Sequence, residues 1–299
     1  MSAAMPLAAR PAGRNYARRY WPFIVPAGLV VFAVIVFPWL FTLYMSAHEF
    51  KIGSDLLYVG LDNYVNLFSD ARFLWSVLRT LYFTALATFF PVVLGIAAAV
   101  VFQRRFPLRG LARTIFILPM MATPVAVALV WTMMFHPQLG VLNYLLTSVG
   151  LPPSLWSYSP NTVIPTLVMV ETWQWTPLVM LIVLGGLASL PSDPYEAARL
   201  DGASGWTMFR HITLPLVWPH IVVALVIRTI DALKSFDLIF VISNGGPGTS
   251  SETMNIYLYQ QAFAFYNMGY ASAMTLVFFV IILLVSLLLF SARRQEKWQ

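Results

Sequence analysis

Long apolar runs constrain this chain more than any other feature of its sequence. Six stretches are long enough to cross a bilayer, and they lie roughly at residues 22–48, 74–102, 110–135, 161–188, 217–242 and 271–291. A helix needs about 20 apolar residues to span the hydrocarbon core. The pattern therefore predicts an all-α polytopic membrane protein with six transmembrane helices.

Composition indicates the same class of protein. Only 10% of the 299 residues are charged, whereas a soluble domain averages about 25%, so the charges are too few to solvate a soluble surface. The net charge of +6 is spread over short clusters between apolar runs, which argues against a nucleic-acid partner. The chain has no cysteine, and this excludes disulfides, thiolate metal sites and cysteine nucleophiles.

Basic residues near the helix ends predict the orientation. Lys and Arg are enriched in cytoplasmic connections, and 13 of the 18 basic residues fall on one side of the predicted bundle. They lie in both terminal tails and in the second–third and fourth–fifth connections. The stretches 136–160 and 243–270, on the other side, contain none. We therefore expect a protein of the cytoplasmic (inner) membrane with both termini in the cytoplasm.

The connection between the fourth and fifth spans, residues 190–219, is rich in structural signals. Asp193 suits a helix N-cap, Pro194 the first helical position, and Glu196 the third residue of a capping box. Gly202 allows a tight stop and the close approach of another backbone. An ordinary helix–turn–helix connector would leave unexplained why so much structure lies between two spans. We therefore interpret the segment as a docking surface.

The same segment carries a spacing that points to a known family. Glu196-Ala197-Ala198, three residues, Gly202, nine residues, Ile212, one residue and Leu214-Pro215 match the "EAA" signature of bacterial ABC-importer permeases. The chain resembles the maltose- and glycerol-3-phosphate-type sugar permeases, specifically the larger partner of the permease pair. Segments 59–64, 244–248 and 269–272 resemble that group too, whereas Arg79 stands where an Asn is usual.

The resemblance implies a fold, a domain organisation and a set of docking residues. The fold would be that of a type I ABC-importer permease over residues 21–292, with cytoplasmic tails at 1–20 and 293–299. Within it, the 190–219 loop would insert into a cleft on a separate ATPase subunit. The residues implied in docking are Glu196, Ala197, Ala198, Asp201, Gly202, Phe209, Ile212, Leu214 and Pro215.

The resemblance also implies partners. They are a second, homologous permease, two ATPase subunits, an external solute-binding (lipo)protein and a sugar, all around a lipid bilayer. The chain itself lacks the G-x-x-x-x-G-K-[ST] phosphate loop, because none of its three lysines follows a glycine. Its histidines show no metal-ligand spacing. We therefore expect a non-catalytic subunit that binds no cofactor, with ATP and Mg²⁺ on the partner ATPases.

Polar residues inside two predicted spans are candidates for solute contact. Ionisable residues within a span usually face a cavity or a partner, and at ~1.5 Å per residue Glu171 and Arg228 both fall near the membrane midplane. They could contact a sugar, neutralise each other, or gate the pathway. Lys234 and Asp237 are expected nearer the external end. The candidate solute-binding residues are Glu171, Gln174, Trp175, Arg228, Asp231 and Ser235.

The sequence analysis leaves other functions open. The solute of an ATP-driven importer could be a disaccharide such as trehalose, or not a sugar at all. An ion- or proton-coupled secondary carrier would use the midplane charges as a relay, without any ATPase. A membrane scaffold or enzyme would not transport. The loop 243–253 is interpreted either as a flexible tether or as an external docking surface.

Overall fold

The computed structural model describes residues 16–294, which form a helical bundle with one small hairpin. Five helices are long and apolar enough to cross a membrane, namely Tyr20–Ser46, Ala71–Gln103, Val163–Ala188, Gly205–Leu233 and Met268–Ser291. A sixth crossing exists only if a bent pair of helices counts as one span. The predicted all-α membrane class is confirmed. Residues 1–15 and 295–299 of the predicted tails lie outside the described residues.

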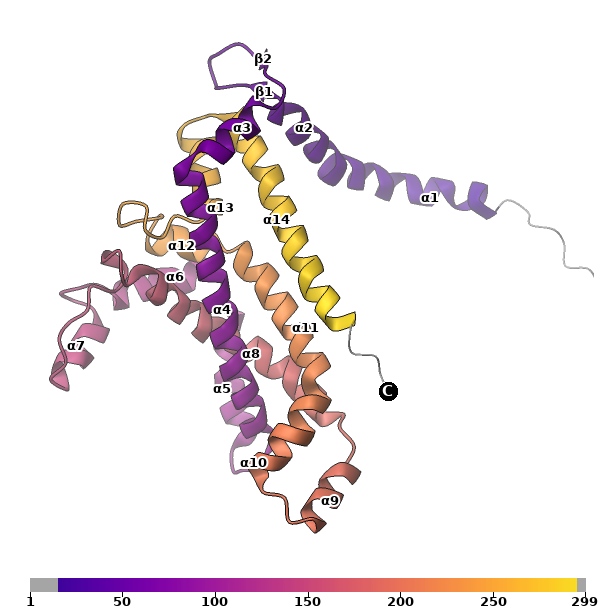
Figure 1. Cartoon of the computed structure of the whole chain (residues 1–299), viewed down its shortest axis with the longest axis vertical. Coiled ribbons are helices and arrows are strands. Elements are labelled where there is room, and N and C mark those ends of the chain that lie inside the picture. Colours follow the sequence, from indigo (N-terminus) through magenta and orange to yellow (C-terminus); the bar gives the residue numbers. More distant parts are fainter. Residues whose placement is uncertain (1–15, 295–299) are drawn as a thin grey trace, which may run out of the picture.

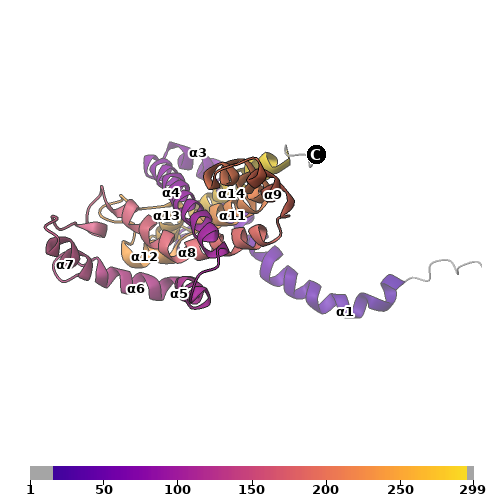
Figure 2. The same cartoon turned by 90° about the horizontal axis from the view of Figure 1, so that it is seen from below.

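The first crossing points away from the rest of the bundle. It consists of α1 (Tyr16–Val31), the π-helical turn η1 (Phe32–Val36) and α2 (Phe37–Ser46). Figures 1 and 2 show α1 projecting sideways, and its apolar stretch is 0% buried within this chain. Only α2 returns to the body, where Trp39 packs edge-on against Phe279 of α14 (Met268–Arg294) at 4.6 Å between ring centroids.

The core of the bundle is formed by α4 (Ala71–Gln103), α8 (Val163–Ala188) and α11 (Leu214–Leu233). One buried apolar cluster contains Phe83 and Leu167, and a second contains Ala99 and Ile221. Residues 171, 174 and 228 lie in sequence between the members of these two clusters. The fold therefore places a polar layer between two apolar layers.

The third predicted span is broken. The single helix expected over residues 110–135 is instead α5 (Arg109–Met121) and α6 (Pro124–Met134), which are bent by 97° relative to each other. Proline disfavours helical backbone at the preceding residue, and Thr123 is accordingly extended, with ψ at 142°. The prediction of one continuous helix here was wrong, because Pro124 begins a new helix instead of kinking the old one.

The fifth predicted span is shorter than expected. The helix predicted over 217–242 ends at Leu233, and a separate helix, α12 (Asp237–Ile242), follows. Between them Lys234 and Phe236 leave the helical region. Ser235 directs its hydroxyl to a carboxylate on α8 at 2.9 Å, so a side-chain bond takes the place of helical continuation.

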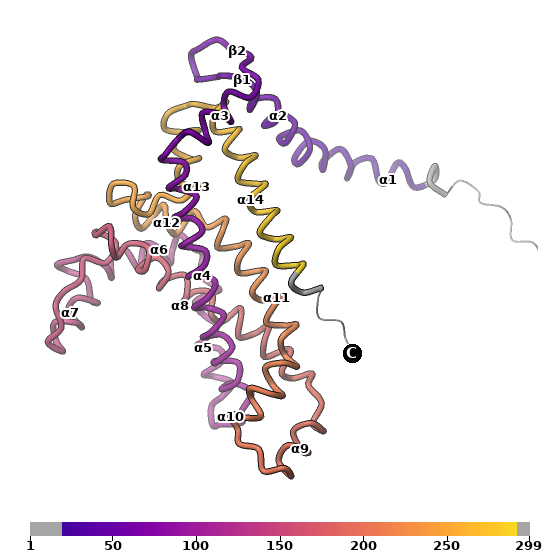
Figure 3. The backbone as a smooth tube through the Cα atoms, in the orientation of Figure 1, coloured from indigo at the N-terminus to yellow at the C-terminus, as the bar shows by residue number. Residues whose placement is uncertain are grey.

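The two ends of the bundle carry different structures (Figure 1). At one end lie the antiparallel hairpin and two short helices: β1 (His48–Glu49), β2 (Leu57–Tyr58), α3 (Asp62–Ser69) and α13 (Met254–Tyr259). At the other end Figure 3 traces the chain out of α8, through α9 (Asp193–Leu200) and α10 (Gly205–Met208), and back into α11. The remaining short elements are α7 (Val141–Ser148), η2 (Trp156–Tyr158), η3 (Phe209–Thr213) and η4 (Gln260–Ala264).

Candidate functional site

A polar pocket of about 340 Å³ lies at the junction of α6, α8 and α11. Inside it a buried ion pair joins two helices: Arg228 Nη2 lies 3.0 Å from Glu171 Oε2, and the side chains are only 1% and 5% exposed. The same Nη2 donates to the Ala87 carbonyl on α4 at 3.3 Å. The residues lining this midplane pocket are Pro124, Glu171, Trp175, Arg228, Asp231, Lys234, Ser235, Phe236, Asp237 and Leu238.

Two further contacts fix the polar groups of the midplane pocket. The Ser235 hydroxyl donates to the second carboxylate oxygen of Glu171 at 2.9 Å. The Arg228 guanidinium lies over the Trp175 ring, 5.1 Å from its centroid, at a distance where the cation attracts the π face. Glu171 is thereby bonded on both oxygens, and one face of Trp175 is covered by the cation.

Five of the six predicted solute-binding residues line the midplane pocket, and Gln174 does not. Gln174 is 1% exposed and donates from Nε2 to the Ala122 carbonyl at 3.2 Å. That carbonyl lies at the break between α5 and α6, so Gln174 satisfies backbone that the broken helix leaves free. The direct Glu171–Arg228 bond corresponds to the pairing alternative, while contact with a solute stays a prediction.

The sequence analysis set aside Lys234 and Asp237 as lying nearer the external end. Both line the midplane pocket. Lys234 Nζ lies 4.0 Å from Asp231 Oδ1, with side chains 54% and 41% exposed. Their place follows from the early end of α11, which brings the 234–237 turn over the pocket. No signal in the sequence marked that end, so the sequence could not place these side chains here.

The predicted docking residues lie on α9 and the turn that follows it, on η3, and at the start of α11, where Leu214 and Pro215 are the first two residues. Glu196, Ala197 and Asp201 are exposed, and none of the residues on α9 is buried. Ser192, not Asp193, occupies the N-cap position, and its side chain makes no capping bond. The predicted capping box is therefore absent, because the helix begins one residue earlier than expected.

Gly202 ends α9 as expected. Its φ is +75°, in the left-handed region that glycine enters without a steric penalty. The Gly202 N–H donates to the Arg199 carbonyl and the Ala203 N–H to the Ala198 carbonyl, at 3.1 and 2.9 Å. This pair of bonds is the Schellman motif, and it turns the chain towards α10.

The sequence analysis missed two exposed apolar residues of the docking segment. Leu200 is 90% exposed and Trp206 is 69% exposed. Trp206 stacks on Phe209 at 5.5 Å between centroids. Trp206 and Phe209 lie three residues apart in this connection, and that spacing is a signal that sequence reading could have used, since large exposed apolar side chains mark interaction sites when they gather.

The loop 243–253 is anchored to α4. Arg72 donates to both carboxylate oxygens of Glu252, at 2.9 and 2.5 Å, and Glu252 is 1% exposed. Arg79 Nη2 donates to the Thr249 hydroxyl at 3.2 Å. The flexible-tether interpretation of this loop was therefore wrong. The unusual arginine at 79 has a structural partner in this loop.

Hydrogen bonds to the Asp70 carboxylate fix the start of α4. Asp70 accepts a bond from the Arg72 backbone N–H at 2.8 Å and from the hydroxyls of Tyr257 and Tyr270 at 2.6 and 2.8 Å. Burial raises the pKa of Asp70, but these bonds outweigh it and hold the pKa below its usual value of 3.8. Burial and the bond to Asp70 raise the pKa of Tyr257 to about 12.

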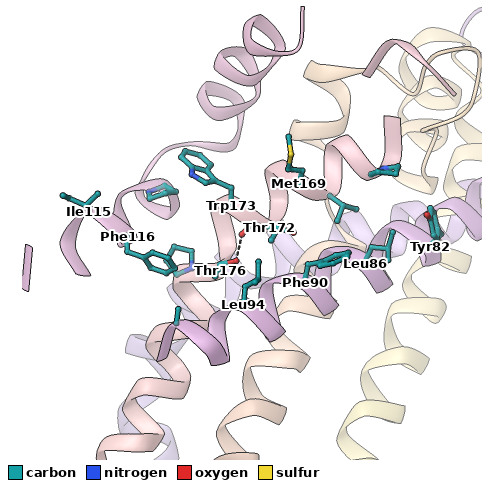
Figure 4. Close-up of a pocket in the computed structure, with 15 residues that line it drawn as sticks. Tyr82, Leu86, Phe90, Leu94, Ile115, Phe116, Met169, Thr172, Trp173 and Thr176 are labelled. Atoms are coloured by element: carbon teal, nitrogen blue, oxygen red, sulfur yellow. Dashed lines mark hydrogen bonds between the residues drawn. The ribbon is translucent and has the colours of Figure 1, made fainter. Parts of the chain in front are cut away.

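A larger cavity, of about 1050 Å³, lies between α4, α5 and α8. Figure 4 shows its lining, where Phe90, Phe116 and Trp173 come from the three helices. The two threonines in view, Thr172 and Thr176, are linked by a bond from the Thr176 hydroxyl to the Thr172 carbonyl at 2.6 Å. The walls are almost entirely apolar, which does not suit a solute rich in hydroxyls.

Comparison with known proteins identifies relatives over most of the chain. The family model "Binding-protein-dependent transport system inner membrane component" matches residues 91–295. The trehalose/maltose transport system permease protein MalF of Thermococcus litoralis is 34% identical over 264 residues, covering 87% of this chain and 88% of the relative. The sulfoquinovosyl glycerol transport system permease SmoG of Agrobacterium fabrum is 32% identical over 266 residues, covering 88% and 86%.

A solved structure has the same fold. It is a chain of a bacterial alginate ABC transporter, whose crystal structure contains the transporter in complex with an alginate pentasaccharide-bound periplasmic protein. The TM-score is 0.81 at 25% identity, covering 95% of this chain and 99% of that chain.

Proposed function

Because this chain belongs to the family of binding-protein-dependent transport system inner membrane components, we propose that it forms half of the solute pathway of an ATP-driven carbohydrate importer. The observation that carries the proposal is the exposed docking segment on α9, α10 and η3, at the opposite end of the bundle from the hairpin (Figure 1). It presents Leu200 and Trp206 to solvent between two membrane-crossing helices. Such a surface suits the cleft of another protein.

The midplane pocket supports a hydroxylated solute. Its walls combine carboxylates, amino and hydroxyl groups with the Trp175 ring. Sugars present hydroxyls that need donors and acceptors, and an apolar ring face that can pack on an aromatic side chain. The names of the three relatives described above refer to trehalose/maltose, sulfoquinovosyl glycerol and alginate, and this agreement favours a carbohydrate over other solutes.

Coupling to ATP requires other chains. We propose that two ATPase subunits bind the docking segment on the cytoplasmic face and hold ATP and Mg²⁺, while a homologous second permease completes the pathway. A solute-binding protein would deliver the sugar at the hairpin end. Both termini would then lie in the cytoplasm. This chain would act as a non-catalytic subunit that binds no cofactor of its own.

Co-purification from the native membrane tests the docking segment. We would compare the natural chain with Glu196→Arg combined with Gly202→Trp. A matched control carries Glu49→Arg with Gly53→Trp at the opposite end, where Glu49 is exposed and Gly53 also has a positive φ of 93°. We expect the ATPase subunits to be retained by the natural chain and the control, and lost from the docking variant.

The other outcome has a clear meaning. If no ATPase accompanies even the natural chain, the importer proposal fails and a secondary carrier becomes the leading function. If ATPase is retained but receptor-driven uptake occurs only with a solute that is not a sugar, the carbohydrate part of the proposal fails alone.

A further inference from the structure

We infer that the midplane pocket selects uncharged saccharides over anionic ones, with Asp231 and Asp237 as the residues that repel anions. This inference rests on the proposed carbohydrate pathway. It concerns the charge of the solute, which membership in the family does not specify. It also assigns a role to Asp237, which sequence reasoning had placed nearer the external end.

The charges around the midplane pocket do not cancel. Three carboxylates and two cations line it. Glu171 and Arg228 neutralise each other in a buried bond of 3.0 Å, so neither offers a free charge to a solute. The charge of Lys234 is offset by that of Asp231, because Lys234 Nζ lies 4.0 Å from Asp231 Oδ1. Asp237 is exposed and forms no ion pair with any residue in the described part of the chain.

The helix ends at the pocket do not reverse this balance. Three helix ends line the pocket: the N-termini of α6 at Pro124 and of α12 at Asp237, and the C-terminal end of α11 at Lys234. With about +0.5 charge at each N-terminus and about −0.5 at the C-terminus, their sum is about +0.5, which is smaller than the full negative charge of Asp237. A carboxylate or sulfonate entering the pocket would therefore meet a site of its own sign, whereas a neutral hydroxyl would not.

A buried donor in the same pocket points to a ligand that carries a hydrogen-bond acceptor. Arg228 lines the pocket and is 1% exposed, yet its Nε–H has no partner within residues 16–294. Its charge is already paired with Glu171, so the partner of Nε–H has to be an acceptor but does not have to carry a charge. A sugar hydroxyl or ring oxygen is such an acceptor, and Trp175, on the same pocket wall, offers an apolar surface beside it.

Equilibrium binding to the assembled complex tests this inference. The complete complex in lipid nanodiscs, without its solute-binding protein, would be titrated calorimetrically with trehalose, maltose and cellobiose. Each would be compared with its monocarboxylate, in which one CH₂OH is oxidised to COO⁻. Leaving out the solute-binding protein prevents its own specificity from masking that of the pocket. Receptor-stimulated ATP hydrolysis by the same preparation reads out the proposed function separately.

Three proteins would be compared in this titration. They are the natural chain, Asp231→Asn with Asp237→Asn, and a control with Glu49→Gln and Asp55→Asn, which removes two exposed carboxylates outside the pocket. We expect the natural chain and the control to bind at least one neutral disaccharide and to bind its carboxylate at least roughly tenfold more weakly, as an uncompensated charge nearby predicts. In the pocket variant this difference should largely vanish, and salt should reduce it in the natural chain.

Each other result overturns the inference. Equal or tighter binding of the carboxylates by the natural chain would show that the pocket does not repel anions. A difference that survives in the pocket variant would remove the roles of Asp231 and Asp237. If no neutral disaccharide binds while the receptor still stimulates ATP hydrolysis, the selection of neutral sugars is wrong and the importer proposal stands.

Discussion

Glu171 joins α8 to two other parts of the midplane pocket. It bonds Arg228 of α11 and the turn residue Ser235, and its location between two apolar clusters makes both bonds hard to replace with water. The sequence analysis placed Glu171 and Arg228 at the same depth, because two antiparallel spans bring their middles together, and mutual pairing was one of its three alternatives for them. It could not predict Gln174, whose partner lies 52 residues away at a break that the apolar pattern does not reveal.

Breaking the Glu171–Arg228 pair should cost much more than breaking an exposed one. Arg228→Met leaves a buried carboxylate uncompensated, and we expect a loss of about 3–5 kcal/mol in the free energy of unfolding. Lys234→Met removes a half-exposed pair and should cost at most about 1 kcal/mol. Thermal melting of each variant in the same detergent measures both. Equal losses would mean that the buried pair is not structural.

Removing the Glu171 carboxylate together with its partner provides the control. Glu171→Leu with Arg228→Met leaves no buried charge, so stability should recover towards that of the natural chain. Uptake should stay impaired, because the pocket has lost its polar wall.

Asp70 should make the stability of the hairpin end of the bundle depend on pH. Its pKa is lowered in the folded protein, so its stabilisation is present above the unfolded pKa of about 4 and is lost as pH falls through the folded pKa. Asp70→Asn should therefore lower the free energy of unfolding at pH 7 by about 1 kcal/mol for each bond that is lost, and the difference from the natural chain should shrink below about pH 4. Melting curves from pH 3 to 8 measure this, with the exposed Asp55→Asn as control. A difference that does not change with pH would contradict the assignment.

Tyr257, which donates to Asp70, should make the stability of the same region fall at alkaline pH. Its pKa is raised to about 12, so its contribution is complete below the unfolded value of about 10 and is lost as pH rises through the folded value. Tyr257→Phe should remove this alkaline loss while weakening the protein slightly at pH 7. Melting between pH 9 and 12 distinguishes the variant from the natural chain.

At the scale of elements, glycines set how closely the helices cross. Gly186 of α8 faces α11, and a Cβ there would lie 2.5 Å from the His220 ring, whereas a Cβ on the adjacent Gly185 would meet nothing within 4 Å. The pair offers a matched test on one helix turn. The sequence alone could not tell the two glycines apart, because only the helix crossing distinguishes their faces.

Gly186→Ala should destabilise the bundle and Gly185→Ala should not. Overpacking at a close crossing costs about 1–3 kcal/mol, while replacing an open helical glycine by alanine gains up to about 1 kcal/mol. Melting temperatures of the two variants measure the difference. If both variants behave alike, the close α8–α11 crossing is not formed in the membrane.

The turn after α9 favours glycine because of its backbone conformation and not because a side chain would clash with neighbouring atoms. No atom lies within 4 Å of a Cβ built on Gly202, so only its φ of +75° restricts substitution. Gly202→Asn should keep most receptor-stimulated ATP hydrolysis, since Asn tolerates this conformation, whereas Gly202→Val should lose it because left-handed backbone costs a branched residue at least about 1–2 kcal/mol. Equal loss in both variants would show that the glycine is needed for contact instead.

At the scale of the whole molecule, the predicted class and most of the helix positions are confirmed. Apolar runs predict where a helix can cross, because hydrocarbon demands length. They do not predict where it stops, since the ends at Met121 and Leu233 depend on a proline and on a side-chain bond to another helix. The composition of α1 likewise does not predict that this helix points away from the rest of the bundle.

The α1 part of the N-terminal crossing should be dispensable for the stability of the isolated chain. The apolar stretch of this crossing is 0% buried against the rest, so deleting residues 1–31 should change the melting temperature of the remaining chain in detergent by less than about 2 °C, the low end of the shift expected for 1 kcal/mol in a domain of about 150–250 residues. Extending the deletion to Ser46 also removes the Trp39–Phe279 contact and the bond from Tyr64 to Ser46, and should lower it clearly. A large loss from the shorter deletion would contradict this prediction.

The elbow between α5 and α6 bears on how well this protein insulates a membrane. The 13 residues of α5 rise only ~20 Å, less than the ~30 Å of the hydrocarbon layer, so the elbow lies inside the electrical barrier. A bare carbonyl there would draw water inward and provide a foothold for leaking protons. The amide of Gln174 donates to the Ala122 carbonyl and so satisfies this carbonyl within the protein. We therefore expect Gln174, which the sequence analysis predicted to bind the solute, to help keep water and protons away from the elbow.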